Sequence, residues 1–528
     1  MAKILVCDKL SENGEKILKS AKGITADFRS GLSEEELIKI VPQYDGLIVR
    51  SGTKITARVL EGSKLKAIGR AGIGVDNIDV TAATRKGIVV MNTPSGNAVT
   101  TAEHTLAMIF AVSRRIPEAS YSVRSGKWER GKFTGSELCN KTLGIVGVGN
   151  IGRIVADRAI GLKMKVIGYD PFLSAEAAEK MGIEPVDLPE LFRCSDYITV
   201  HAPLTDKTKN LVDRKAFGQM KKGVYVINCA RGGIVNESDL VSAIKEGIVK
   251  GAAVDVFEKE PPPADHPFFG IPQVVTTPHL GAATDEAQEA VAVEVARMMA
   301  DYFQNGTIHN AVNFPSISAE GLKILGPFIH LAEKLGSLQG QLLERLPREV
   351  RIEYRGDVAE YNLAAVTQAA LKGLLSATVS DVTVNFVNAS WIARERGLKV
   401  VESKFSEHKD FASLITITME IDGTTRSVSG TIFGKMQPRI VQINEFYLEA
   451  LPEGTILVIH NQDRPGVIGN IGTLLGKKKI NISRMQLGLM RQSGEAIALY
   501  NVEGDLKQEV IEEIEKLPNI ISVKKVVL

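Results

Sequence analysis

The sequence predicts an α/β protein that begins with two parallel-sheet units and ends with mixed α+β regions. Over residues 1–280, short apolar strands rich in β-branched side chains alternate with helical patterns, as they do in βαβ units. One strand, residues 142–146, runs directly into a glycine-rich turn and then a helix. From residue 456 onward the pattern becomes strand, helix, two strands, helix and strand. At 528 residues the chain is long enough for three or four domains.

Apolar runs define the first unit and the helix that follows it. The expected strands are residues 3–8, 46–51, 67–70 and 87–92. A long helical pattern over residues 101–115 then leads into the second unit. Short strands separated by helical segments favour a parallel sheet.

A glycine-rich turn carries the clearest functional signal of the second unit. Directly after an apolar strand, it reads Gly147-Val148-Gly149-Asn150-Ile151-Gly152. In this pattern Gly147 permits the tight turn, Gly149 lets the backbone approach a pyrophosphate, and Gly152 lets the new helix pack on the strand. The helix N-terminus also attracts phosphate. The sequence therefore predicts a dinucleotide site.

The next strand indicates which dinucleotide binds. Residues 166–170 form an apolar strand that ends in Asp170, about 20 residues beyond the glycines. A carboxylate there can accept hydrogen bonds from both hydroxyls of the adenine ribose, but it would repel a 2′-phosphate. Residues 171–173 supply no adjacent arginine to receive such a phosphate. We therefore expect NAD as the cofactor.

Four further strands are expected to complete a doubly wound sheet. They are residues 197–201, 224–229, 252–257 and 274–277. Ligands of such sheets bind in a crevice at the carboxyl ends of the strands. A helical stretch over residues 285–304 follows the last strand, and we expect it to pack back on the first unit.

Three side chains that follow the later strands are the best catalytic candidates: Arg231, Glu260 and His279. Oxidising an alcohol with NAD needs a base for the hydroxyl proton and a cation for a substrate carboxylate. His279 is the expected base, and Arg231 is the expected carboxylate clamp. Glu260, beside the imidazole, would fix its tautomer and favour its protonated form. Singly each could be an ordinary loop or surface residue, but together, downstream of a nucleotide motif, they favour a dehydrogenase.

Four motifs resemble the D-isomer-specific 2-hydroxyacid dehydrogenase family, and within it the phosphoglycerate branch. They are residues 69–77 (GRAGIGVDN), 147–152 (GVGNIG), 229–233 (CARGG) and 278–282 (PHLGA). The resemblance covers essentially the whole chain. It implies a Rossmann-like, doubly wound nucleotide domain at 99–284 and a discontinuous, flavodoxin-like substrate domain at 1–98 and 285–316.

The resemblance also implies roles for individual residues. Arg231, Glu260 and His279 keep the roles given above, and Asp255 would contact the nicotinamide amide. The further expected cofactor contacts are Asn150, Ile151, Cys229, Ala230 and Gly281, and the further expected substrate contacts are Ser51, Gly74, Val75 and Asn77.

The first unit carries the features that choose the substrate. The turn Gly72-Ile73-Gly74 lacks the third glycine of a dinucleotide motif, so we interpret it as a backbone-amide loop for a small anion. Arg50 and Arg70 end two strands beside it, although either could be a surface residue. A phosphate with nearly two negative charges needs such donors. With the resemblance, this predicts oxidation of 3-phospho-D-glycerate to 3-phosphohydroxypyruvate, the first step toward serine.

Residues 317–452 change pattern and carry no catalytic motif. A helical segment at 326–346 precedes strand-like runs at 413–419 and 425–433. This α+β region resembles the extra domain that the long members of the phosphoglycerate branch carry. In those enzymes it can serve as a regulatory site for an anion or substrate.

Residues 453–528 resemble an ACT domain, a βαββαβ module that binds small amino acids at paired interfaces. The loop that contains Asp463 and the strand start at Asn481 match the ligand pattern of that module. These two side chains could receive an amino group or a hydroxyl. We therefore expect L-serine as an effector, bound between subunits of a homo-oligomer, either a dimer or a homotetramer.

Composition excludes several classes of partner. A net charge of +2 gives no global field for nucleic acid or a membrane. No segment approaches the ~18 apolar residues of a membrane span, and the first apolar run is too short for a signal peptide. The four cysteines, at positions 7, 139, 194 and 229, lack metal-binding spacing. We therefore expect no metal, no nucleic acid or membrane partner, and a cytoplasmic location.

Two alternative functions stay open at this point. A glyoxylate or hydroxypyruvate reductase of the same family would use a smaller substrate, for which Arg50 and Arg70 would be less useful. A dinucleotide-sensing protein of the corepressor type could keep the fold without turnover. The presence together of Arg231, Glu260 and His279 argues against the second alternative.

Overall fold

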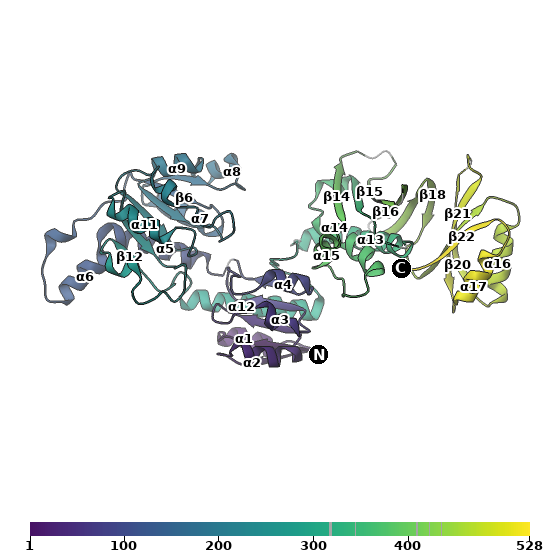
Figure 1. Cartoon of the computed structure of the whole chain (residues 1–528), viewed down its shortest axis with the longest axis horizontal. Coiled ribbons are helices and arrows are strands. Elements are labelled where there is room, and N and C mark those ends of the chain that lie inside the picture. The colour runs from purple at the N-terminus through teal and green to yellow at the C-terminus, as the bar shows by residue number, and fades with distance from the viewer. Residues whose placement is uncertain are drawn as a thin grey trace.

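Four sheets organise the chain, and each lies in a separate lobe of the computed structural model, in order from purple through teal and green to yellow (Figure 1). The structure describes residues 1–94, 96–315, 319–343, 345–407, 410–421, 423–434, 436–490 and 492–528. Within these ranges, no helix is both long enough and apolar enough to cross a membrane.

The first lobe contains a parallel sheet in the order β2-β1-β3-β4-β5. Its elements are β1 (Ala2–Val6), α1 (Glu12–Ser20), β2 (Ile24–Phe28), α2 (Glu34–Ile40), β3 (Gly46–Val49), α3 (Ala57–Glu61), β4 (Ala67–Arg70), α4 (Val80–Arg85) and β5 (Val89–Asn92). This order is flavodoxin-like, as predicted. Sequence reasoning missed β2, because it is an edge strand in which only Ile24 is buried and no continuous apolar run marks it.

The second lobe contains the sheet β12-β11-β10-β9-β6-β7-β8. Its strands are β6 (Thr142–Val146), β7 (Lys165–Tyr169), β8 (Glu184–Pro185), β9 (Tyr197–Val200), β10 (Val224–Asn228), β11 (Val249–Val254) and β12 (Val274–Thr276). Its helices are α5 (Ala98–Arg114), α6 (Ile116–Arg124), α7 (Asn150–Gly161), α8 (Ala175–Lys180), α9 (Leu188–Cys194), α10 (Arg214–Phe217) and α11 (Glu237–Lys245). The strand order reverses at β6 and β9, as in the predicted doubly wound fold, and such a switch point opens a crevice for ligands.

Helix α12 (Asp285–Asn305) returns the chain to the first lobe. Its apolar face, with Val291, Val295 and Met299, packs in one buried cluster with Ile4 and Val6 of β1. Figure 1 shows this long teal helix running beside the purple sheet. The predicted packing of this helix on the first unit is therefore confirmed.

The third lobe is an α+β region with the sheet β14-β13-β15-β16-β17-β18. Its elements are α13 (Ala319–Gln341), β13 (Glu349–Gly356), α14 (Ala364–Thr378), α15 (Ala389–Glu395), β14 (Lys399–Phe405), β15 (Ser413–Ile421), β16 (Thr424–Phe433), β17 (Gln437–Ile443) and β18 (Phe446–Ala450). Helix α13 begins and ends earlier than the expected 326–346. Sequence reasoning missed α14, whose residues are buried on most sides and therefore lack a clear amphipathic period.

The fourth lobe has the predicted βαββαβ order and the antiparallel sheet β20-β21-β19-β22. Its elements are β19 (Thr455–Gln462), α16 (Val467–Lys477), β20 (Asn481–Met490), β21 (Glu495–Glu503), α17 (Gln508–Glu515) and β22 (Ile520–Val527). Phe446 of the third lobe and Ile456 and Leu499 of the fourth belong to one buried cluster. The third and fourth lobes therefore share a hydrophobic core.

Candidate active site

The glycine-rich turn connects β6 to the N-terminus of α7. Gly147 has a φ of +92°, a backbone conformation that residues other than glycine rarely adopt. Its amide donates to the carbonyl oxygen of Tyr169 at 2.8 Å. A Cβ placed on Gly152 would lie 2.1 Å from the carbonyl oxygen of Gly147, so the start of α7 packs directly on the turn. A Cβ on Gly149 would meet nothing within 4 Å. The turn therefore leaves open space beside the amides at the start of α7, as a bound pyrophosphate requires.

Asp170 lies at the end of β7, next to this turn. Its Oδ2 accepts a hydrogen bond from the amide of Val148 at 2.9 Å, and its Oδ1 accepts one from the amide of Phe172 at 2.9 Å. The two amides hold the carboxylate beside the glycines. The charge and position of Asp170 fit the adenine ribose of NAD.

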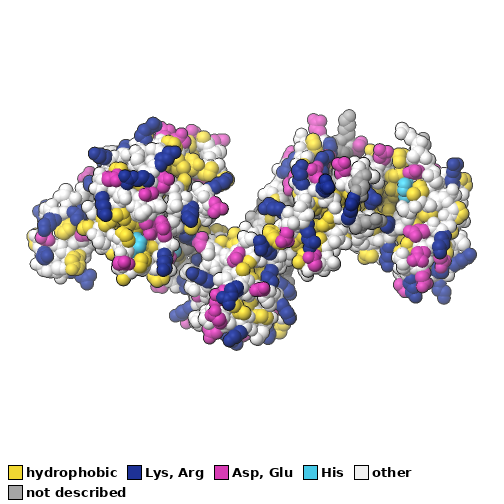
Figure 2. All heavy atoms as spheres, in the orientation of Figure 1, with side chains coloured by type: hydrophobic (Ala, Val, Ile, Leu, Met, Phe, Trp, Pro, Cys, Tyr) yellow, Lys and Arg dark blue, Asp and Glu magenta, His cyan; other side chains and the backbone are white. Residues whose placement is uncertain are grey.

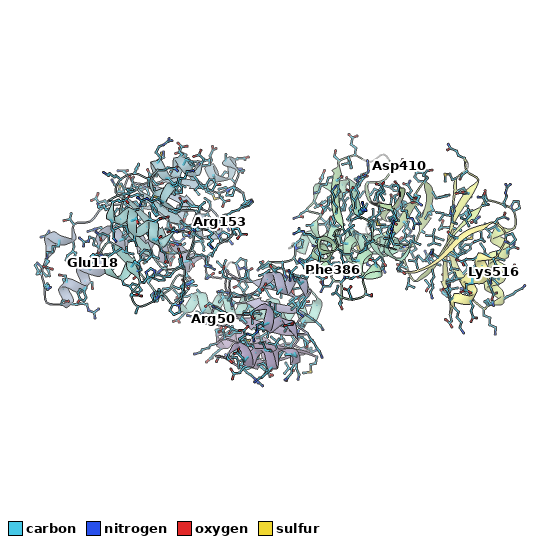
Figure 3. The ribbon with its side chains drawn as sticks, in the orientation of Figure 1. Arg50, Glu118, Arg153, Phe386, Asp410 and Lys516 are labelled. Carbon is cyan, nitrogen blue, oxygen red and sulfur yellow. The ribbon has the colours of Figure 1, made fainter. Side chains whose placement is uncertain are left out.

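Arg153 is a cation of this site that sequence reasoning missed. It lies in the first turn of α7, where its Nη2 donates to Oδ1 of Asn150 at 2.6 Å. Figure 3 shows Arg153 at the edge of the second lobe and Arg50 on the first lobe, on the sides where the two lobes approach each other. The sequence signal for Arg153 is a cation in the first turn of the helix after a glycine-rich motif. A pyrophosphate bound at that motif would lie near such a cation.

The loop after β10 presents Arg231. The buried side chain of Asn228 fastens this loop: its Nδ2 donates to the carbonyl oxygen of Arg231 at 2.9 Å, and its Oδ1 accepts from the amide of Ala230 at 3.1 Å. Cys229 and Ala230 are buried. Burial, and then the nearby Asp255, raise the pKa of the Cys229 thiol, so that it stays protonated at neutral pH.

His279 and Glu260 form a hydrogen-bonded pair. Nδ1 of His279 lies 2.7 Å from Oε2 of Glu260, and the amide of Phe257 donates to Oε1 at 3.1 Å. Burial alone would raise the pKa of Glu260, but the hydrogen bonds from His279 and Phe257 outweigh it, and the net pKa is below the usual value. An ionised Glu260 accepts from Nδ1–H, which leaves Nε2 of His279 for a ligand.

An apolar pocket adjoins this pair. Its volume is about 290 Å³. Its lining residues are Phe257, Glu260, Pro261, Pro262, Phe269, Thr276, Thr277, Pro278 and His279. The imidazole and the carboxylate line this pocket and also reach solvent, with side chains 44% and 38% exposed.

Asp255 fastens the loop that carries His279. Its buried carboxylate accepts hydrogen bonds from the hydroxyl of Thr277 at 2.5 Å and from the amides of Leu280 and Gly281 at 2.7 and 2.8 Å. Nε2 of His104, on α5, lies 3.2 Å from its Oδ1. Sequence reasoning missed both His104 and Thr277. These partners already use both oxygens of the Asp255 carboxylate. The expected contact of Asp255 with nicotinamide stays a prediction.

The hydrogen bonds of Asp255 also govern its protonation. Burial raises the pKa of this carboxyl, but the hydrogen bonds from His104, Thr277 and Leu280 together lower it by more. The carboxylate is therefore ionised at neutral pH, and it stabilises the loop as an anion.

The first lobe brings Arg50 and Arg70 to the same cleft. The amide of Arg50 donates to Asp8 at 2.6 Å, and Nη1 of Arg70 donates to the carbonyl oxygen of Ala71 at 3.0 Å. Among the described residues, the buried Nε of Arg70 has no hydrogen-bond partner. An unsatisfied buried donor favours the arrival of an anion at this point.

Asn77, Ser51 and Val75 lie in the loops around these arginines. Nδ2 of Asn77 donates to the carbonyl oxygens of Arg50 and Thr53 at 2.7 and 2.6 Å. This amide therefore ties the Arg50 loop to the loop of residues 72–77. Ser51 is exposed, and Val75 is half-buried.

Asp463 and Asn481 lie far along the chain, in the fourth lobe. Asp463 follows β19, where its amide donates to the carbonyl oxygen of Gly494 at 2.8 Å. Asn481 begins β20, and its Nδ2 donates to Oε2 of Glu503 at 3.2 Å. Both side chains are exposed. They are available to a ligand or to another subunit.

Three segments of the chain match known protein families. Residues 106–281 match the NAD-binding domain of the D-isomer specific 2-hydroxyacid dehydrogenases. Residues 324–444 match the intervening domain of D-3-phosphoglycerate dehydrogenase, and residues 455–519 match the ACT domain.

Several solved structures share the fold of the first two lobes. The NAD complex of the NAD-dependent formate dehydrogenase from Staphylococcus aureus has a TM-score of 0.53 and 30% identity, covering 59% of this chain and 98% of that chain. A glyoxylate reductase from Paecilomyes thermophila has a TM-score of 0.55 and 28% identity, with the same coverage of 59% and 98%.

Curated relatives match over nearly their full length. The D-3-phosphoglycerate dehydrogenase of Archaeoglobus fulgidus is 43% identical over 98% of this chain and 98% of its own length. That of Bacillus subtilis is 40% identical over 99% of both chains. The chain therefore belongs to the D-3-phosphoglycerate dehydrogenases, an NAD-binding branch of the D-isomer-specific 2-hydroxyacid dehydrogenase family.

Proposed function

We propose that this enzyme oxidises 3-phospho-D-glycerate to 3-phosphohydroxypyruvate with NAD, the first step toward L-serine. The observation that carries the proposal is the hydrogen-bonded pair of His279 and Glu260, in a cleft that Arg231 bridges to the first lobe. This arrangement supplies a base, a cation for the substrate carboxylate and a neighbouring dinucleotide site.

His279 acts as the base in this proposal. When NAD is bound, it supplies the hydride acceptor. Nε2 of His279 takes the proton of the substrate hydroxyl, while Glu260 holds Nδ1–H and stabilises the imidazolium that forms. In the reverse direction, the imidazolium returns the proton to the carbonyl oxygen.

The arginines divide the two anionic groups of the substrate between them. Arg231 binds the carboxylate with its planar fork. Arg50 and Arg70 bind the phosphate from the first lobe, where the buried Nε of Arg70 still lacks a partner among the described residues. Phosphate binding at two arginines selects 3-phospho-D-glycerate over smaller 2-hydroxy acids.

Asp170 sets the preference for NAD over NADP. Two backbone amides hold its carboxylate beside the glycine-rich turn. The ribose hydroxyls of NAD can donate to this carboxylate, whereas a 2′-phosphate would bring a second negative charge against it.

L-serine is the proposed effector, and a second subunit completes its site. Asp463 and Asn481 are both exposed, and they lie near opposite ends of β21 in the ACT domain. The proposed regulation works through differential affinity of serine for two conformations, because a ligand can shift an equilibrium in no other way.

Association of subunits is supported by the arm that contains α6. Among its exposed apolar side chains are Ile116, Tyr121, Val123 and Trp128, of which Trp128 is 84% exposed. Figure 1 shows α6 projecting from the second lobe, and Figure 2 shows hydrophobic and basic side chains on this projection. An apolar projection of this kind is typical of an interface between subunits, so we propose a homo-oligomer, either a dimer or a tetramer.

The proposal is tested by initial rates of NADH formation over a panel of phosphorylated and plain 2-hydroxy acids, with and without L-serine. Fast turnover of 3-phospho-D-glycerate that serine inhibits is the expected result. Preference for glyoxylate or hydroxypyruvate reduction would instead indicate the reductase alternative. No turnover of any substrate would indicate a dinucleotide-sensing protein.

A further inference from the structure

Asp76 contacts the proposed carboxylate clamp from the opposite side of the cleft. Its Oδ2 accepts a hydrogen bond from Nε of Arg231 at 2.7 Å. Asp76 lies in the loop between β4 and α4 of the first lobe, whereas Arg231 follows β10 of the second lobe. The ion pair therefore joins the two lobes at the site itself.

The contacts of Arg231 determine which edge of its guanidinium a ligand can meet. Nε donates to Asp76, and Nη1 donates to the carbonyl oxygen of Ala230 at 2.7 Å. A Cβ placed on Gly74 would come within 1.7 Å of Nη2, so the bare glycine makes the space that Nη2 fills. Asp76 uses Nε and Ala230 uses one N–H of Nη1, so the remaining N–H groups of Nη1 and Nη2 are the donors left for a carboxylate.

Charge gives Asp76 a second effect in the cleft. Burial, and then the nearby Arg231, lower the pKa of Arg70 to about 10, and Asp76 acts in the opposite direction. Arg50 also lowers the pKa of Arg70, and Asp8 raises it. Asp76 therefore offsets part of the electrostatic repulsion among Arg50, Arg70 and Arg231. The proposed substrate would bind these three arginines together.

We propose that Asp76 is a positioning residue for Arg231. By holding Nε, it fixes the rotation of the guanidinium so that Nη1 and Nη2 meet the carboxylate of the substrate end-on. Because the pair spans both lobes, Asp76 also holds the phosphate-binding loops of the first lobe in register with the base of the second lobe. The inference rests on the proposed function in taking a 2-hydroxy acid as the ligand of Arg231.

Variants of Asp76 test this role through kinetics and binding. Asp76→Asn keeps the shape and removes the charge, and Asp76→Glu restores the charge. We expect Asp76→Asn to lower kcat/KM for 3-phospho-D-glycerate by about 10- to 100-fold, because a charge-assisted hydrogen bond is lost. Most of this loss should lie in KM, and Asp76→Glu should recover part of it. The Kd for NAD, measured by calorimetry, should not change.

A double-mutant cycle separates positioning from a general effect on folding. Lysine has no planar fork to rotate, so in an Arg231→Lys background Asp76→Asn should cost less than about 3-fold in kcat/KM. The thermal midpoint of Asp76→Asn should stay within about 2 °C of wild type, because an exposed ion pair contributes little to stability.

Asp79 offers a matched control in the same segment. Its Oδ1 accepts from the amide of Ala82 at 2.8 Å and caps α4. Asparagine caps helices equally well, so Asp79→Asn removes a nearby charge and should leave kcat/KM unchanged. An equal loss in the Asp79 and Asp76 variants would show a general charge effect and would overturn the positioning role.

Two further results would overturn the inference: unchanged kcat/KM in Asp76→Asn, or an undiminished loss in the Arg231→Lys background. D-glycerate, assayed in parallel, keeps the two proposals distinguishable. Wild-type enzyme that oxidises D-glycerate but not its 3-phosphate would refute the proposed function, while the Asp76 cycle could still be measured with D-glycerate. Wild-type enzyme that oxidises neither would overturn both.

Discussion

Replacing Asp255 with asparagine should loosen the loop that holds His279. Both oxygens of the Asp255 carboxylate accept hydrogen bonds, Oδ1 from Thr277 and Leu280 and Oδ2 from Gly281. An amide has a single acceptor oxygen, so in either orientation its NH₂ group faces a backbone N–H. A buried donor left without an acceptor costs about 1 to 3 kcal/mol. If that cost falls on the ordered loop, kcat drops by a factor of about 5 to 150.

The assay compares kcat at saturating NAD and 3-phospho-D-glycerate with the free energy of unfolding in denaturant. Thr277→Val is the matched control, because it removes one neutral donor and keeps the Asp255 carboxylate. We expect this control to lose only about 0.5 to 1.5 kcal/mol of stability. Wild-type kcat and wild-type stability in Asp255→Asn would show that the Asp255 carboxylate does not hold the His279 loop.

The same substitution has a pH signature. The pKa of Asp255 is lower in the folded protein than its ordinary value of 3.8. Its contribution to stability is therefore fully present above that value and is lost as pH falls through the folded pKa. The stability difference between wild type and Asp255→Asn should stay constant near neutral pH and shrink below about pH 4. A difference that stays constant to about pH 2 would contradict this origin of the stabilisation.

Five other outcomes are expected. Asp170→Ala should narrow the preference for NAD over NADP, measured as the ratio of kcat/KM values. Equal values for the two cofactors in the wild type would show that Asp170 does not select NAD. His279→Ala should lower kcat by roughly 100-fold or more. In Glu260→Gln, loss of the carboxylate disfavours the imidazolium, so oxidation should persist to lower pH, and an unshifted pH profile would show that the two side chains are not coupled. Arg70→Ala should raise KM for 3-phospho-D-glycerate far more than for D-glycerate, and equal losses would place Arg70 outside the phosphate site. Asp463→Ala should weaken inhibition by L-serine without changing kcat in its absence, and equal inhibition would refute the effector site.

Features that depend on local pattern could be predicted from the sequence. The glycine-rich turn can be read directly, because Gly147 needs a positive φ and Gly152 needs bare backbone next to the turn. Candidates such as His279 were also within reach, because each follows a strand and parallel strands end at one edge of the sheet.

Contacts between distant segments were out of reach of the sequence. Asp76 and Arg231 are 155 residues apart, and no local period connects them. His104 lies in the middle of a helical pattern, and the sequence does not show that it faces the buried Asp255. In the sequence alone it resembles any other polar residue of a helix. Helix α14 was missed for the opposite reason, because burial on most sides removed the amphipathic period that marks a helix.

The proposed active site is shared between two lobes, with a base in one and a phosphate clamp in the other. The most direct test is the ratio of kcat/KM for 3-phospho-D-glycerate to that for D-glycerate, measured with NAD on the full chain. Two charge-assisted contacts to the phosphate predict a ratio of about 100 or more, and Arg50→Ala combined with Arg70→Ala should remove most of it. A ratio near one in the wild-type enzyme would contradict a phosphate site at Arg50 and Arg70.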